Sequence, residues 1–352
     1  MSDIVIPGKV ILRHKSGSHA YGTVTPESDL DIRGIFIANK TYYHGFVKRV
    51  EQVQDMKNDI TMYELVKYFT LAAKANPNIL ESMFVRDEDI IEIDELGERL
   101  RAHRDLFLSK KCKYTYSGYA HAQLKRIKSH RKWLLDPPKA LPARADYGLP
   151  EQTLVPNDQL QATLSMIQRK IDTWDIDFLG MPEPDKIYVT EQIEKYLIDI
   201  NVSSDVKWNC AARSINLGDN FIDALDRERR YNTAKTNWKQ YREWRANRNE
   251  KRAVLERKFG YDTKHGSHLI RLMRTCVEIL EHNTVHVFRP DAKELLAIRN
   301  GARSYESIIE EAEQLKNKAN ELYKTSMLPY IVDHNKLDAL CIELVEASHA
   351  KR

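Results

Sequence analysis

Apolar and polar residues alternate along the N-terminal part of the chain, from Lys9 to about Ile60, which is the pattern of half-buried β-strands. The alternation is clear in residues 10–18 and 29–38, and a short third stretch covers residues 59–63. Gly, Pro and Ser between the first two stretches mark a loop. The pattern therefore predicts a small sheet near the N-terminus.

From Met62 onward, apolar positions recur at the three- and four-residue spacing of amphipathic helices. The first helix ends at Asn76-Pro77, and residues 79–85 fit either a short helix or a strand. Further helices are predicted over residues 94–109, 115–135, 159–174, 232–258 and 263–282, then a short strand or hairpin near 283–289 and two closing helices. The proline-rich residues 136–155 are the best linker candidate, although they need not separate independent domains.

These patterns predict an α+β protein with a small sheet-containing unit, residues 1–100, and a larger helical body, residues 101–352. The length of 352 residues allows two domains or one domain with a large appendage, and 42% hydrophobic with 30% charged residues excludes a disordered chain. No run of eighteen apolar residues occurs, and residues 1–17 lack the features of a signal peptide. We expect a cytoplasmic protein, of the host cell if the chain is phage-encoded, with no membrane partner.

The four cysteines are far apart and lack metal-type spacing, so we expect reduced thiols in the core. The formal net charge of +4 conceals a strong segregation of charge. Residues 101–133 carry ten Lys/Arg and one acid, residues 224–258 carry twelve Lys/Arg and five acids, and residues 87–98 carry seven acids and no base. In both basic segments Trp and Tyr are interleaved with the cations. This composition favours a nucleic-acid surface over solvated helix faces.

Candidate chemistry lies around the first loop. Asp29 and Asp31 stand two apart, so on a strand they point the same way while Leu30 points into a core. Two carboxylates on one face suit a divalent cation, and Mg²⁺ combines one or two carboxylates with substrate phosphates. Gly17 and Ser18 offer backbone N–H groups and a hydroxyl to a triphosphate. A lone Asp-x-Asp more often caps an exposed strand edge, but the combination with the Gly-Ser turn favours a site.

Further candidates lie on predicted helices and on the second strand. Lys264, His268 and Arg271 follow each other at i, i+4 and i+7 on a helix capped by Asp262 or Thr263, and fit either a phosphate or a solvated face. His265 with His268 is a poor zinc site, because no further ligand has suitable spacing. Two weaker nucleotide-binding candidates complete the set. Lys67 could reach a triphosphate, although a lysine on an amphipathic helix is usually just exposed. Arg33 fits a ligand phosphate and an ion pair with Asp29 or Asp31 about equally well.

Gly17-Ser18, ten residues and Asp29-Leu30-Asp31-Ile32 together resemble the signature of the polymerase-beta-type nucleotidyltransferase superfamily. The resemblance implies a mixed sheet with flanking helices, two Mg²⁺ (or Mn²⁺) ions, an NTP substrate such as ATP, and a third carboxylate, for which Asp59 is the candidate. It further implies that Asp29 and Asp31 bridge both metals, while Asp59 holds the metal that activates a hydroxyl and accepts its proton.

A narrower resemblance covers nearly the whole chain. The blocks DITMYELVKYFTLAAKANPNILESMF, GYAHAQLKRI, HRKWLLDPP, YGLPE, GYDTKHGSHLIRLMRTCVEIL and RPDAKELLAIRNGARSY are similar to those of a family of predicted nucleotidyltransferases of phages and bacteria, associated with RNA repair and RNA ligases.

Three functions follow as hypotheses. The first is transfer of NMP from an NTP to an RNA end, with release of pyrophosphate. The second is transfer to a protein hydroxyl (AMPylation) by the same site. The third is an inactive RNA-repair scaffold, against which the complete carboxylate set argues.

Overall fold

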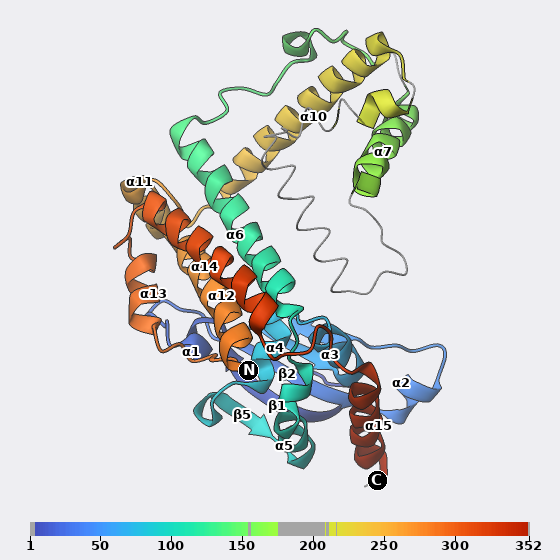
Figure 1. Ribbon diagram of the computed structural model, residues 1–352, viewed down its shortest axis with the longest axis vertical. Helices are drawn as coiled ribbons and strands as arrows, with labels where there is room; N and C mark the ends of the chain where they lie inside the picture. The colour runs from blue at the N-terminus through green and yellow to red at the C-terminus, as the bar shows by residue number, and fades with distance from the viewer. Residues whose placement is uncertain (1–3, 154–155, 175–207, 209–210, 216, 351–352) are drawn as a thin grey trace. The chain divides into compact units, whose positions relative to one another are not determined.

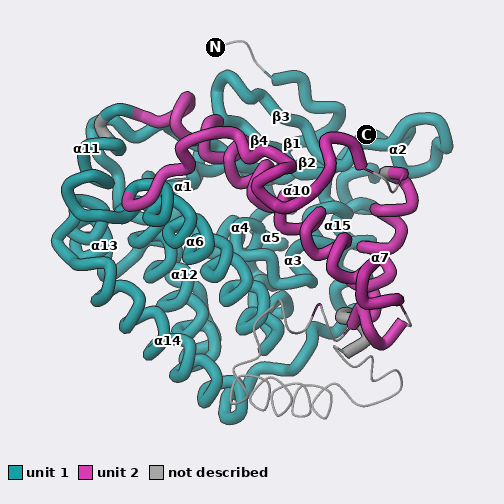
Figure 2. The backbone as a smooth tube through the Cα atoms, turned by 90° about the horizontal axis from the view of Figure 1, so that it is seen from above, with its two compact units in different colours: residues 1–134, 250–352 teal, residues 135–249 magenta. Residues whose placement is uncertain are grey.

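The computed structural model describes residues 4–153, 156–174, 208, 211–215 and 217–350. This part of the chain divides into two compact units, residues 1–134 with 250–352 and residues 135–249 (Figure 2). The expected boundary near residue 100 does not coincide with this division, because helices on both sides of it share one hydrophobic core with the sheet. The proline-rich stretch lies at the start of the second unit.

The first unit is built on a five-stranded mixed sheet of order β3-β4-β2-β1-β5. Figure 1 labels three of these strands, β1, β2 and β5. Its strands are β1 Gly8–Ser16, β2 Asp31–Ala38, β3 Gln52–Asp55, β4 Ile60–Glu64 and β5 Ile90–Ile93. The central pair β2/β4 is parallel, and β1/β2, β1/β5 and β3/β4 are antiparallel. The α+β class and the N-terminal mixed sheet expected from the sequence are thus confirmed.

Short helices connect these strands and long helices follow them. Those of the first unit are α1 Gly17–Tyr21, α2 Lys40–His44, α3 Leu65–Ala72, α4 Pro77–Met83, α5 Glu95–Ala102, α6 Cys112–Leu135, α11 Glu250–Phe259, α12 Thr263–His282, α13 Ala292–Arg299, α14 Tyr305–Thr325 and α15 His334–Ala350, with 3₁₀ turns at Asp87–Asp89 and Arg104–Phe107. Local signals set several starts: Glu64 caps α3, Asn76 caps α4 with Pro77 at its first position, and Asp262 caps α12.

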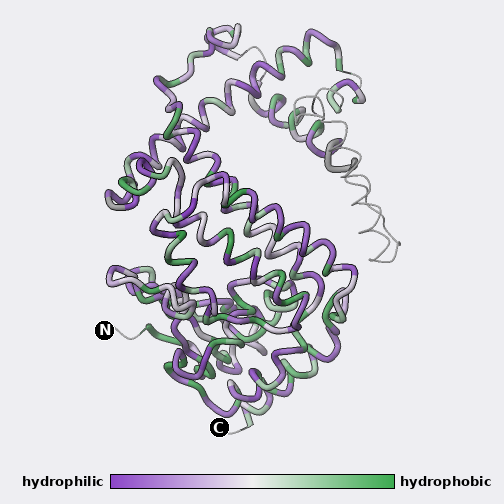
Figure 3. The backbone as a smooth tube through the Cα atoms, turned by 60° about the vertical axis from the view of Figure 1, so that its left-hand side comes forward, coloured by the Kyte–Doolittle hydropathy of each residue, from purple (hydrophilic) through white to green (hydrophobic). Residues whose placement is uncertain are grey.

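The two faces of the sheet bury different cores. Ile35 and Ile37 of β2 join the main core with side chains of α3, α4, α6, α12 and α15. Phe36 and Ala38 point to the other face and pack with Met62. Along the helices, hydrophobic positions recur in short stretches between hydrophilic ones (Figure 3), and no helix among the described residues is long and apolar enough to cross a membrane.

One predicted element is wrong. Residues 283–289 form neither a strand nor a hairpin, because no neighbouring strand pairs with them. The segment instead follows the left-handed cap Asn283 and packs by Val285 and Val287. The Arg289 backbone N–H donates to the Tyr21 carbonyl at 3.1 Å. Cys112, Cys276 and Cys341 are buried free thiols, as expected, and Cys210 lies outside the described residues.

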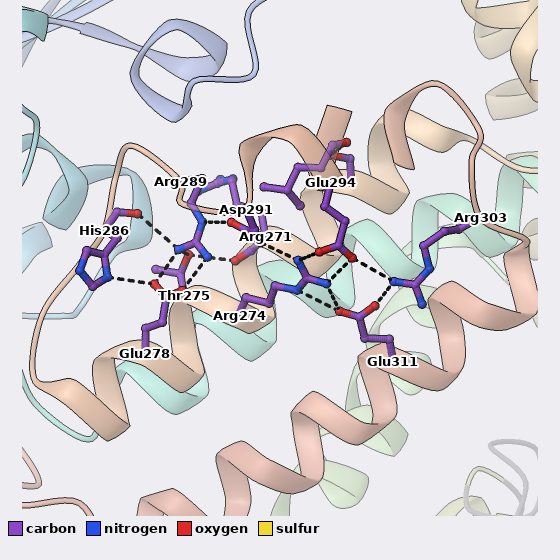
Figure 4. A network of polar contacts seen from close by, with 12 residues as sticks. Arg271, Arg274, Thr275, Glu278, His286, Arg289, Asp291, Glu294, Arg303 and Glu311 are labelled. Carbon is purple, nitrogen blue, oxygen red and sulfur yellow. Dashed lines mark hydrogen bonds and ion pairs between the residues drawn. The ribbon is translucent and has the colours of Figure 1, made fainter. Parts of the chain in front are cut away.

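An ion-pair network fixes α12, α13 and α14 together (Figure 4). Arg274 of α12 contacts Asp291, Glu294 of α13 and Glu311 of α14 at 2.6–2.7 Å. Arg289, which is 1% exposed, pairs with Glu278 of α12 and with Asp291. The network therefore holds α13 and the segment before it against α12.

The second unit contains the 3₁₀ turn Arg144–Tyr147 and the helices α7 Asn157–Trp174 and α10 Asp219–Ala246. Its small core includes Leu160, Ile167, Trp208 and Leu225. Arg144 pairs with the buried carboxylate of Glu228, which ties the turn to α10.

Candidate active site

The turn between β1 and α1 is shaped by Gly17. Its φ of +60° is in the left-handed region, and a Cβ built on it would lie 2.2 Å from Oδ2 of Asp31. Glycine alone accommodates both the conformation and this approach. The register of β1 and β2 pairs Ser16 with Asp31, and the Ser18 hydroxyl makes no hydrogen bond to any described residue. The Gly17 turn and Asp31 therefore lie against each other.

Asp31, the half-buried first residue of β2, is the centre of the site. Burial raises the pKa of its carboxyl; Arg33 lowers it, Asp59 raises it, Lys264 lowers it and Asp29 raises it, in decreasing order. These four charged groups therefore lie close enough to Asp31 to act on its charge. The structure brings together five of the residues that the sequence singled out.

Asp59 reaches Asp31 through the parallel pairing of β2 and β4. Ile32 pairs with Ile60, and the Ile32 N–H donates to the Asp59 carbonyl at 3.0 Å. Asp59 has a φ of +50° in the turn that enters β4. This register places it beside Asp31, at the position expected of a third carboxylate.

The expected strand geometry of the aspartate pair is wrong in one respect. β2 begins at Asp31, so Asp29 precedes the strand, and Leu30 is 43% exposed instead of pointing into a core. Asp29 therefore lies in the loop before β2, and Asp31 is the first residue of the strand. The path of the loop, not strand geometry, brings the Asp29 carboxylate near Asp31. Alternation along a strand predicted that the two aspartates lie near each other, and they do, although only Asp31 is on the strand.

The donor set of this cluster suits a hard divalent cation. None of the three carboxylates makes an ion pair or hydrogen bond with a described residue. Carboxylate oxygens are the ligands that Mg²⁺ prefers, and the absence of a side chain at Gly17 lets the Asp31 carboxylate lie against the turn. The oxygen atoms of the three carboxylates do not all lie within 4.8 Å of one another, so they are too far apart to bind one ion together without moving.

Arg33 shares the face of β2 with Asp31, as expected from their spacing. Its guanidinium donates to the Asn78 carbonyl at 3.0 Å, which anchors it at the start of α4. The anchored charge is also the strongest attractive influence on Asp31. Arg33 is thus positioned between the carboxylates and α4.

Cations from α12 and α13 face the carboxylates. Partial burial lowers the pKa of Lys264, and Arg252 and Arg299 lower it further, while Asp262 and Asp31 raise it. Burial lowers the pKa of His268 to about 3, helped by Arg271 and Lys264, so this imidazole is neutral at pH 7. Mutually repelling cations beside a carboxylate cluster favour an anionic ligand such as a triphosphate.

Arg271 has a different environment from Lys264. It is 6% exposed, donates to Oε1 of the buried Glu81 at 2.6 Å and lies 3.8 Å above the Tyr21 ring. The Tyr21 hydroxyl donates to Oε2 of Glu81 at 2.6 Å. Arg271 therefore joins α12 to α1 and α4 beneath the site.

The structure does not bring Lys67 to the cluster. Lys67 lies on α3 and pairs with Glu51 at 2.6 Å. The strand β4 runs from Ile60 beside Asp59 to Glu64 before α3, so about 16 Å of strand separates the two ends.

Sequence reasoning missed Arg299, Glu81 and Tyr21. Arg299, in the last turn of α13, donates to the Thr23 carbonyl at 3.5 Å and acts on both Lys264 and His268. Tyr21 lies close to Gly17 because both belong to α1, whereas Arg299 and Glu81 reach the site by packing between distant helices, for which the sequence spacing gives no signal.

The two basic segments have both packed and exposed cations. In α6, Arg131 lies over the Tyr305 ring and donates to the Gly260 carbonyl, whereas four cations are exposed: Lys125, Arg126, Lys128 and Lys132. In α10, Arg242 lies over the Trp238 ring at 5.2 Å. The exposed cations exceed those used in packing.

A glycine turn against a carboxylate cluster at the edge of a small mixed sheet is the arrangement expected of the polymerase-beta-type nucleotidyltransferase superfamily. Residues 3–134 match the model of the family described as the RNA repair pathway DNA polymerase beta family.

Two curated relatives each match about a third of the chain. An uncharacterized 38.9 kDa protein of the nrdC-mobD intergenic region of Enterobacteria phage T4 is 28% identical over 127 residues, 33% of this chain and 38% of the relative. The uncharacterized protein YcgL of Bacillus subtilis (strain 168) is 29% identical over 123 residues, 33% of this chain and 46% of the relative. The match thus spans less than half of either relative, and no solved structure matches the chain.

Proposed function

We propose that the protein is a metal-dependent nucleotidyltransferase that transfers NMP from an NTP to a hydroxyl acceptor, with an RNA end as the acceptor. The observation that carries the proposal is the gathering of Asp29, Asp31 and Asp59 beside the Gly17 turn. The family of residues 3–134 supports the same chemistry.

In the proposed reaction, the acceptor oxygen forms a bond to the α-phosphorus of the NTP. The bond from that phosphorus to the bridging oxygen of the β-phosphate breaks, and pyrophosphate leaves with the bond's electron pair. Asp29, Asp31 and Asp59 would hold two Mg²⁺ or Mn²⁺ ions, which supply Lewis-acid stabilisation of the phosphoryl oxygens when bound. Asp59, an exposed carboxylate in the turn that enters β4, would accept the proton of the attacking hydroxyl.

The cations around the carboxylates have the charge to hold the triphosphate. Lys264 and Arg299 come from α12 and α13, and Arg33 comes from β2. Gly17 and Ser18 would contribute backbone N–H groups and the unpartnered hydroxyl. Lys67, which pairs with Glu51, takes no part in triphosphate binding. His268 is neutral at pH 7 and would form a hydrogen bond to the nucleotide.

The charge of the helices supports an RNA acceptor. Exposed cations line α6, and α10 carries exposed Lys239, Arg242 and Arg245 beside Trp238. Cations neutralise phosphates and aromatic rings stack on unpaired bases, so each helix suits a single-stranded polyanion. The family's description as part of an RNA repair pathway agrees, and we propose a functional association with an RNA ligase.

The test is incubation of the full chain with labelled NTPs, Mg²⁺ or Mn²⁺, and either a panel of RNA ends or protein alone. We expect label on RNA, dependence on the metal, and RNA affinity that falls steeply with salt because bound phosphates release counterions. Glu92→Gln, an exposed carboxylate change on β5 away from the cluster, serves as the matched control and keeps activity. Label on protein in the absence of RNA would mean that the acceptor is a protein hydroxyl and not RNA. Absence of label on both RNA and protein would overturn nucleotidyl transfer in favour of a scaffold role.

A further inference from the structure

Two histidines and an aspartate converge where α6 meets the start of α12. Nδ1 of His130 lies 3.3 Å from Oδ2 of Asp262, and Nε2 of His265 lies 3.5 Å from the same oxygen. All three atoms lie within 4.8 Å of one another, and among the described residues this is the one such group of His, Cys, Asp or Glu. His130 comes from a segment 132 residues before Asp262, which is why spacing around His265 could not indicate it.

The distances fit shared ligation better than hydrogen bonding. N–H···O bonds cluster at about 2.9–3.0 Å, and both contacts are longer. Around a tetrahedral zinc ion with bonds of about 2.0–2.1 Å, neighbouring ligand atoms lie about 3.3–3.4 Å apart. The two separations from Asp262 are thus close to those of ligands around one small ion, and the two imidazole nitrogens lie within 4.8 Å of each other.

Neighbouring groups orient these donors. Oε1 of Gln123, on α6, accepts from Nδ1 of His265 at 2.7 Å, which leaves Nε2 with its lone pair on the side of Asp262. The second oxygen of Asp262 caps α12 by accepting the His265 backbone N–H at 3.1 Å. Arg252 donates at 2.6 Å to Oδ2, the oxygen that faces both histidines, and a carboxylate oxygen has a second lone pair for an ion.

We propose that His130, Asp262 and His265 bind one transition-metal ion of the zinc class, with a fourth position open to water. Two imidazoles and one carboxylate are ligands that Zn²⁺ and Co²⁺ take, whereas Mg²⁺ prefers oxygen alone. The ion joins α6 to the first turn of α12, next to Lys264. It thereby stiffens the element that carries Lys264 and His268, and this role does not depend on nucleotidyl transfer.

The test uses the full chain, stripped with a chelator and titrated with Zn²⁺ alone or Co²⁺ alone. We expect one ion per chain by elemental analysis after gel filtration and the strong visible absorption of four-coordinate Co²⁺. His130→Ala and His265→Ala abolish both signals. His286→Ala, a change to another histidine that contacts a carboxylate, Glu278, at 3.5 Å, keeps both signals.

Gln123→Leu covers the case in which the histidine variants fail to fold by circular dichroism. It leaves all three ligands in place, and we expect Zn²⁺ affinity to fall about 10- to 100-fold, as for other outer-shell changes. A wild-type chain that retains no Zn²⁺, or histidine and Gln123 variants that bind it as tightly as wild type, would overturn the proposal. Each of these readouts is independent of nucleotide and of RNA.

Discussion

The buried pair of Glu81 and Arg271 makes a quantitative prediction. Both side chains are nearly inaccessible, at 4% and 6% exposed, and their atoms are 2.6 Å apart. Removing one partner of a buried ion pair costs about 3–5 kcal/mol, because the other charge stays buried without compensation. Arg271→Met also loses the contact with the Tyr21 ring, which is worth about 2 kcal/mol when desolvated.

We therefore expect Glu81→Gln and Arg271→Met each to lower the free energy of unfolding by about 3–5 kcal/mol. The double variant leaves no buried charge unpaired. Its loss in free energy of unfolding should therefore be at least about 2 kcal/mol smaller than the summed losses of the two single variants. The measurement is urea unfolding of the four proteins, followed by circular dichroism and analysed as a double-mutant cycle.

The same four proteins separate two roles for Arg271. If Arg271 supports the fold, the double variant folds and binds NTP as wild type does. Single substitutions that each cost less than about 1 kcal/mol, or costs that add, would refute the reasoning from the buried pair. A folded double variant that no longer binds NTP would show that Arg271 contacts the nucleotide.

Two further predictions concern β1 and the turn after it. Gly17→Ala places a Cβ 2.2 Å from Asp31 Oδ2 in a left-handed conformation, so we expect loss of metal-dependent transfer and about 1–2 kcal/mol of stability, measured by transfer assay and urea unfolding; full activity would contradict the close approach. Burial lowers the pKa of His14 to about 4 from 6.5, so protonation favours the unfolded chain, and stability present above pH 6.5 is lost as the pH falls toward 4. Between pH 7.5 and pH 5, His14 should account for about 2 kcal/mol of the decrease in the free energy of unfolding, so this decrease should be about 2 kcal/mol smaller in His14→Asn. Urea unfolding at both pH values measures it, and an unchanged pH dependence would contradict the prediction.

The parts of the site that sequence predicted are those set by neighbouring strands. Gly17 directly follows β1, Asp31 begins β2 and Asp59 precedes β4, so strand pairing alone brings them together. Leu30 was placed wrongly because alternation holds only within a strand, and β2 begins one residue later.

The rest depends on packing between distant segments, which no local pattern encodes. Arg299 and Glu81 come from helices whose placement follows from the whole core, and His130 meets Asp262 only because α6 crosses the start of α12. The residues 283–289 show the converse: their apolar alternation suits a strand, yet a strand forms only with a partner.

The central claim is that the carboxylates around Asp31 perform metal-dependent transfer. The most direct measurement compares nucleotidyl transfer and melting temperature of wild type and the Asp29→Asn/Asp31→Asn double variant. Because burial and neighbouring carboxylates raise the pKa of Asp31, its charge is unfavourable in the fold, and the account predicts no transfer with an unchanged or raised melting temperature. Transfer at the wild-type rate, or a variant that does not fold, would contradict it.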